Sequence, residues 1–250
     1  LTNYFNFSEQ DYCLKRKLEE KGIVVFLNLE LRLENGNVKD ETCDIHIIFD
    51  NLLDEKEVKC FLASMPAKVV NKRLDSISSK DDYKKAVVNF DDLVECLNDK
   101  SLNLKNRYMI GILSRGKGSS RLSSVFEDIA ERCDFFIHSS DKQKNIEEDK
   151  EYLNSHGKPL LQSSDAHSFE KIGGKFSWIK ADLNFEGLRQ IMFEPSERIS
   201  LGKDNPDSKL AMEYYIEPET KESDYLKISS PKELKICDPA CGSGHILVYA

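Results

Sequence analysis

Two short stretches decide the predicted fold of this chain, "LNLELRL" at Leu27–Leu33 and "DIHIIF" at Asp44–Phe49. In the first stretch every second residue is a leucine, and the residues between them are Asn28, Glu30 and Arg32. Side chains of an extended chain point alternately to opposite faces, so this pattern predicts a β-strand with one apolar and one polar face.

The second stretch repeats the alternation, with Ile45, Ile47 and Phe49 on one face and His46 and Ile48 on the other. Two interpretations are open. In the first, the stretches are edge strands with one face in water, and the two strands alone favour this interpretation. In the second, the apolar faces pack beneath helices on the outside of a barrel, and Glu30 and His46 point into its polar centre.

Further along the chain, apolar runs alternate with stretches of helical periodicity. The expected strands lie at Gly22–Leu33, Asp44–Phe49, Arg107–Leu113, Asp134–His138 and Pro159–Ser163. The expected helices lie at Glu55–Ser64, Asp81–Leu97, Ser120–Cys133, Ile146–Ser155 and Asn184–Phe193, the last with Asn184 as N-cap and Pro195 beyond its end. Such alternation predicts an α/β domain with a mostly parallel sheet, open or barrel-like.

Composition limits the classes of function. The 250 residues carry a formal net charge of -8, so the chain as a whole lacks the basic character of a protein that coats nucleic acid. No apolar run approaches the roughly 18–20 residues of a membrane helix, and no signal peptide opens the chain. The seven cysteines are scattered and odd in number, which favours a reduced, cytoplasmic location over a disulfide framework.

The strongest chemical signal in the first 200 residues is "GKPLLQSSDAHS", Gly157–Ser168. It reads as a short strand followed by a loop that carries Asp165 and His167. A carboxylate oxygen and an imidazole nitrogen two residues apart suit Zn, Mn or Fe, and such ions activate water for phosphoester hydrolysis. From spacing alone, an Asx-turn with an exposed histidine explains the pattern equally well.

The stretch "KPLLQSSDAHSFEKIGGKFSWIKADLNFEGLRQIMFEPSERI" resembles the end of a polymerase-and-histidinol-phosphatase (PHP) domain, as found at the head of TrlF-type AAA-like ATPases. The resemblance runs from about Gly22 to Gly202 and implies a distorted (β/α)7 barrel that hydrolyses phosphoesters with a divalent metal. By this resemblance Asp165 and His167 match the final metal-binding pair, while Glu30 and His46 match ligands on two earlier strands. It therefore favours the barrel over the edge-strand interpretation.

Several positions depart from the PHP pattern. The opening His-x-His would precede Leu1, and Ser114 with Arg115 stands where the family has a histidine after a middle strand. His138 lies where the family often has Glu, and we expect it to be a core histidine. "GKGSSR", Gly116–Arg121, lacks the spacing of a phosphate-binding P-loop but leaves an anion-binding nest open. A single bound ion, rather than a full cluster, is the expectation.

The closing stretch "DPACGSG", Asp238–Gly244, follows the expected strand Leu234–Cys237. Gly242 and Gly244 allow a tight turn and close approach of a ligand to the backbone, and a helix is expected to begin near Ser243. The dinucleotide fingerprint fails, because Leu247 occupies the place of its third glycine.

This motif and the residues before it, from about Leu210, resemble motif I of adenine-specific DNA methyltransferases, most closely the PglX type of BREX phage-defence systems. The resemblance implies a Rossmann-like domain in which S-adenosylmethionine is bound by Asp238, Ala240, Cys241, Gly242 and Gly244. The catalytic Pro-Pro-aromatic motif of these enzymes is missing, since no two of the seven prolines are adjacent. We therefore expect the chain to be a fragment.

The predicted organisation is an N-terminally truncated PHP-like domain at 1–202, a linker and pre-motif segment at 203–233, and the start of a methyltransferase domain at 234–250. The predicted partners are DNA or another nucleic acid through the parent enzymes, with an ATPase domain or other defence-system proteins, and no membrane. The alternative is a non-catalytic remnant or binding module.

Overall fold

The computed structural model describes residues 1–36, 42–114, 124–138, 148–149, 157–162, 164, 166 and 168–201. Contacts divide the chain into one unit of Leu1–Pro206 and another of Asp207–Ala250, and only the first contains described residues. The predicted linker and the whole predicted methyltransferase segment therefore lie outside the described residues.

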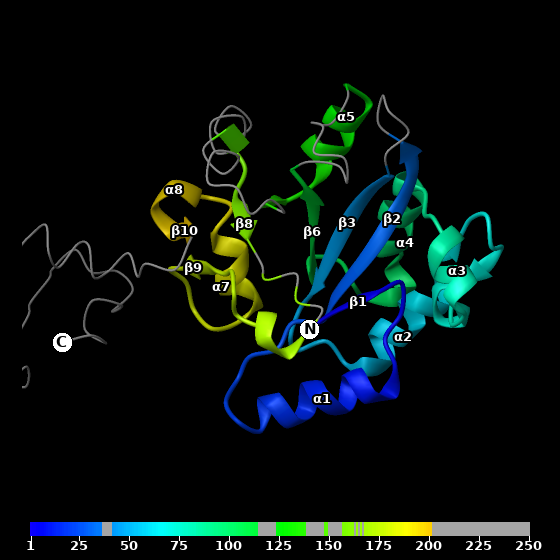
Figure 1. The fold of residues 1–250 in the computed structure, drawn as a ribbon, viewed down its shortest axis with the longest axis horizontal. Helices are drawn as coiled ribbons and strands as arrows, with labels where there is room; N and C mark the ends of the chain where they lie inside the picture. Colours follow the sequence, from blue (N-terminus) through cyan, green and yellow to red (C-terminus); the bar gives the residue numbers. More distant parts are fainter. Residues whose placement is uncertain are drawn as a thin grey trace, which may run out of the picture. The chain divides into compact units, whose positions relative to one another are not determined.

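The centre of the first unit is a six-stranded sheet in the order β1-β2-β3-β6-β7-β8 (Figure 1). Its strands are β1 Thr2–Tyr4, β2 Asn28–Gly36, β3 Thr42–Phe49, β6 Tyr108–Leu113, β7 Phe135–His138 and β8 Leu160–Gln162. Three pairings are parallel, and β3 alone runs against its neighbours β2 and β6. The predicted α/β class with a mostly parallel sheet is confirmed at this level, whereas closure into a barrel stays a prediction.

The edge-strand interpretation of Leu27–Leu33 and Asp44–Phe49 is wrong. β2 pairs with β1 on one side and β3 on the other, and β3 pairs with β2 and β6. The predicted alternation nevertheless holds, because one face of both strands is fully buried through Leu29, Leu31, Leu33, Ile45, Ile47 and Phe49. The polar face thus belongs to interior strands that pair antiparallel with each other, an arrangement in which one face of a sheet can stay in contact with water.

Helices in the described part of the chain pack on both faces of the sheet. They are α1 Glu9–Glu19, α2 Glu55–Ser64, α3 Lys80–Lys85, α4 Phe90–Leu97, α5 Ser124–Arg132, α7 Phe185–Gln190 and α8 Pro195–Arg198. Apolar side chains of α2, α4 and α5 join the strand residues in the main hydrophobic core. Short elements complete the unit: β4 Pro66–Ala67, β5 Lys72–Arg73, η1 Leu74–Ser76, η2 Lys100–Leu102, η3 Phe169–Lys171, and the antiparallel pair β9 Ser177–Ile179 and β10 Ile199–Leu201.

The single helix predicted over Asp81–Leu97 is wrong. Val88 leaves the helical path because its backbone N–H donates to the Arg32 carbonyl, and its own carbonyl accepts from Glu34 N–H. This bridge ends α3, and Asn89 then caps α4 by accepting from Asp92 N–H. Helical periodicity continues across the break, so the pattern could not reveal it.

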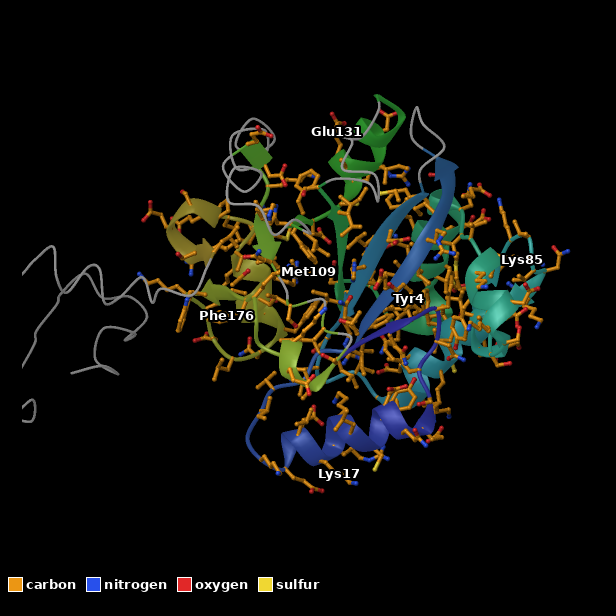
Figure 2. All side chains as sticks on the ribbon, viewed as in Figure 1. Tyr4, Lys17, Lys85, Met109, Glu131 and Phe176 are labelled. Atoms are coloured by element: carbon orange, nitrogen blue, oxygen red, sulfur yellow. The ribbon has the colours of Figure 1, made fainter. Side chains whose placement is uncertain are left out.

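The opposite face of the sheet is divided. Toward β6, β7 and β8 it is apolar, and Met109 and Phe135 pack there against Phe185 and Ile191 of the α7 region. Figure 1 shows α7, β9 and β10 beside β8, and Figure 2 labels Met109. Toward β1, β2 and β3 the same face is polar. We call this polar half the hairpin patch; it comprises Thr2, Tyr4, Asn28, Glu30, Arg32, Asp44 and His46.

Candidate functional site

A single row of residues crosses the sheet at the level of Glu30. Tyr4 of β1 lies beside Glu30, and Glu30 lies directly opposite His46. The row continues through Gly111 of β6 to Phe135 of β7. Directly opposed residues share a face and hold their Cβ atoms about 4.5–5.5 Å apart, so the carboxylate and the imidazole are close neighbours.

Gly111 marks the boundary between the polar and apolar halves of this face. A Cβ atom added there would stand 2.4 Å from two ring carbons of Phe135, whose side chain is buried. The Phe135 ring therefore lies over the glycine, next to His46 in the row. Glycine is required here because the aromatic ring occupies the space of a side chain.

His46 is held by its neighbour in the next row. Asn28 Nδ2 lies 3.0 Å from His46 Nδ1 and 2.9 Å from Thr2 Oγ1, and the imidazole is 9% exposed. Sequence analysis placed Asn28 on the polar face without assigning it a role. The contact with Thr2 could not be predicted, because β1 has only three residues and is too short to show an alternating pattern.

The third row of the patch is structural. Arg32 donates through Nη1 to the carbonyls of Tyr83 and Lys84 in α3, and its Nε lies 3.7 Å from Asp44 Oδ1. Asp44 is 2% exposed. Arg32 thus fastens α3 to the sheet, and its charge is balanced by a buried carboxylate rather than presented freely to a ligand.

The four predicted metal ligands are described only in part. Glu30 and His46 come together, whereas Asp165 and His167 lie outside the described residues. β8, the strand that leads into them, runs parallel to β6 and β7 in the same sheet. Within the described part of the chain no three His, Cys, Asp or Glu side chains gather as a metal site. The chemistry of the Glu30 and His46 pair still fits a hard or borderline divalent ion, since one carboxylate oxygen and one imidazole nitrogen share a polar face.

His138 lies on the opposite, apolar face, as the core interpretation predicted. Its Nδ1 lies 2.8 Å from Asp149 Oδ2, and the same oxygen accepts a hydrogen bond from Ser114 Oγ at 2.8 Å. All three residues are buried. Ser114, which stands where the PHP pattern has a histidine, therefore belongs to a structural cluster behind the sheet and not to the hairpin patch.

The predicted cofactor loop, with Asp238, Ala240, Cys241, Gly242 and Gly244, lies outside the described residues, as does Gly116–Arg121.

No protein-family model matches this chain, and no curated protein matches it either. None of the helices in the described part of the chain combines the length and the apolar character that a membrane crossing needs.

Proposed function

We propose that the first unit is a metal-dependent phosphoesterase or nuclease of the PHP type, with Glu30, His46, Asp165 and His167 as its metal-binding residues. The observation that carries the proposal is the register of β2 and β3, which sets Glu30 opposite His46 on the polar half of one sheet face. A carboxylate and an imidazole side by side supply two of the ligand types that divalent ions prefer in proteins.

Each residue has a distinct task in this proposal. Glu30 supplies a hard carboxylate oxygen and negative charge, and His46 supplies a ring nitrogen from the adjacent strand. A bound divalent ion would lower the pKa of a coordinated water and polarise a phosphoryl oxygen. Asp165 and His167 follow β8 in the sequence, and β8 runs in the same direction as β2 within the sheet.

The test is hydrolysis of a model phosphodiester, bis(p-nitrophenyl) phosphate, by the full chain with manganese or zinc. The purified protein should show metal-dependent turnover that EDTA abolishes. Glu30→Gln and Asp165→Ala should each reduce this turnover to background, because each removes an anionic ligand. Glu131→Gln, an identical substitution at an exposed position of α5, should retain it.

Unchanged turnover in Glu30→Gln or Asp165→Ala would refute the proposal. The alternative of a non-catalytic binding module predicts neither turnover nor bound metal. Metal analysis of the purified protein separates the phosphoesterase from the binding module. The phosphoesterase should contain stoichiometric metal, and the binding module should contain none.

We propose for the second unit that Asp238–Gly244 binds the methionine part of S-adenosylmethionine, as the start of an adenine-specific DNA methyltransferase domain. The sequence "DPACGSG" supports this proposal. Equilibrium dialysis with labelled S-adenosylmethionine tests it: Asp238→Asn should lower retention of the label, and Asp207→Asn should not. Equal retention by both variants would contradict it. The chain lacks a Pro-Pro-aromatic motif, so we expect no transfer of label to DNA.

A further inference from the structure

The feature that carries a further inference is the contact between Asn28 and His46. The amide nitrogen Nδ2 has two hydrogens and no lone pair, so it can only donate. Its two neighbours, Thr2 Oγ1 at 2.9 Å and His46 Nδ1 at 3.0 Å, account for both hydrogens. His46 Nδ1 must therefore accept, and in a neutral ring the single ring hydrogen is then on Nε2.

The second histidine of the sheet is held in the opposite way. His138 Nδ1 faces the carboxylate of Asp149, which can only accept, so this nitrogen carries the hydrogen. His138 Nε2 is buried without a hydrogen-bond partner among the described residues. The molecule thus holds two buried imidazoles in different tautomers, and the difference follows from an amide in one place and a carboxylate in the other.

We propose that Asn28 is a positioning residue that fixes the ring orientation and the tautomer of His46, with the hydrogen on Nε2 in the metal-free protein. Asn28 Oδ1 is buried and has no hydrogen-bond partner among the residues that the structure describes. A half-turn of the amide would bring this oxygen to His46 Nδ1, where it would accept a hydrogen bond instead. Asn28 can therefore serve either tautomer, but only one at a time.

The consequence for metal binding rests on the proposed function. A metal ion could be coordinated by His46 Nε2 only through a lone pair on a nitrogen that carries no hydrogen. Nε2 must then release its proton to solvent, Nδ1 must take one up, and the Asn28 amide must turn to accept from Nδ1–H. Partners behind a ligating histidine typically change metal affinity by about 10–100-fold. Asn28→Asp offers only acceptors and should favour the metal-binding tautomer in advance.

The first experiment needs no metal. Long-range ¹H–¹⁵N spectra of the histidine rings, recorded on the full chain at a pH where both are neutral, distinguish the two tautomers. We expect Nε2–H for His46 and Nδ1–H for His138 in the same spectrum, and Nδ1–H for both in Asn28→Asp. Nδ1–H for His46 in the unaltered protein, or no change in the variant, overturns the proposal. Unchanged His138 signals show that the variant is folded.

The second experiment measures zinc and manganese affinity by competition with a chromophoric chelator. Asn28→Asp should bind about tenfold more tightly than the unaltered protein. Thr2→Asp, which adds the same charge on the neighbouring strand without an acceptor at Nδ1, is the matched control and should change affinity less. Equal effects of the two variants would overturn the role of Asn28. A protein that binds no metal refutes the proposed function, while the ring spectra still decide the tautomer.

Discussion

The two faces of the central sheet each hold a buried histidine, and the two histidines are used differently. His138, on the helix-covered face, is 2% exposed and pairs with a buried carboxylate. His46, on the divided face, is 9% exposed, contacts an amide, and lies opposite Glu30. Burial does not separate these residues. Their polar neighbours do, because the Asp149 carboxylate lies within hydrogen-bond distance of His138 inside the core, whereas His46 contacts the Asn28 amide and lies opposite Glu30 on the adjacent strand.

The comparison teaches where chemistry can reside on this fold. In the His138 cluster, Asp149 Oδ2 lies within hydrogen-bond distance of both His138 Nδ1 and Ser114 Oγ, and all three residues are buried. The hairpin patch instead lies beside an apolar half that α7 covers, and it brings a carboxylate and an imidazole together on adjacent strands.

The largest expected effect comes from breaking the buried pair. His138→Ala removes the imidazole that pairs with the buried Asp149 carboxylate, and breaking a buried pair of this kind costs about 3–5 kcal/mol of unfolding free energy. Urea denaturation should show this loss. His46→Ala should cost much less stability but should abolish metal-dependent turnover. Equal destabilisation by the two substitutions would erase the distinction between the two faces.

A double variant sharpens this result. The double variant His138→Ala with Asp149→Ala removes both the buried carboxylate and the histidine that pairs with it. Its loss of unfolding free energy should therefore be smaller than the sum of the losses in the two single variants. Additive losses would mean that the two side chains contribute through packing alone.

Much of the divided sheet could be predicted from the sequence, because its signals are local. The alternation of leucine with polar residues in Leu27–Leu33 predicts both faces of β2. The predicted helix Glu55–Ser64 agrees with α2 at both ends, and Asn184 is the N-cap of α7, as expected from its side chain. Each of these features depends on residues within a turn or a strand of one another.

Features that depend on distant partners could not be predicted. The reversed direction of β3, the bridge through Val88 and the pairing of His138 with Asp149 all join segments far apart in sequence. The first strand and α1 were also missed, the strand because three residues carry little pattern. Asn28 illustrates the limit for the site, since its role appears only when Thr2 and His46 are both beside it.

Gly111, at the border of the two halves, offers the next largest effect. Gly111→Ala forces a methyl group against the Phe135 ring, and overpacking of this kind typically costs about 1–3 kcal/mol. Thermal or urea unfolding measures the loss. Phe135→Leu should partly rescue the variant, because the smaller side chain vacates the space. A lack of rescue would show that the ring does not set the border.

Lys158 stabilises the end of α5 on the helix-covered face. Its ammonium group donates to the carbonyls of Ala130, Glu131 and Cys133 at the end of α5. Lys158→Met keeps most of the aliphatic chain but loses these donors, and we expect a loss of about 1–2 kcal/mol. Urea denaturation at pH 7 should show it, and a neutral result would mean that water satisfies these carbonyls.

The same substitution has a pH signature. Burial lowers the pKa of Lys158 in the folded protein. Between this lowered pKa and the ordinary value of about 10.4, the unfolded chain binds more protons than the folded protein does. The free energy of unfolding of the unaltered protein should therefore rise with pH across that window. Lys158→Met should lack this component of the rise. Parallel stability curves of the two proteins across that window would show that folding does not lower the pKa of Lys158.

The smallest expected effect concerns the cover of the apolar half. Asn184 caps α7 by accepting from Gly187 N–H at 2.7 Å, and the adjacent Phe185 N–H donates to Asn51 Oδ1 after β3. Asn184→Ala should cost about 1 kcal/mol. Because the cap serves only the cover, hydrogen exchange should quicken in α7 and stay unchanged in β2 and β3. Asn89→Ala, at the matching cap of α4, should leave exchange in α7 unaltered. Faster exchange throughout the sheet in Asn184→Ala would mean that the polar and apolar halves of this face unfold as one cooperative unit. The stability of the hairpin patch would then depend on α7, which packs on the apolar half.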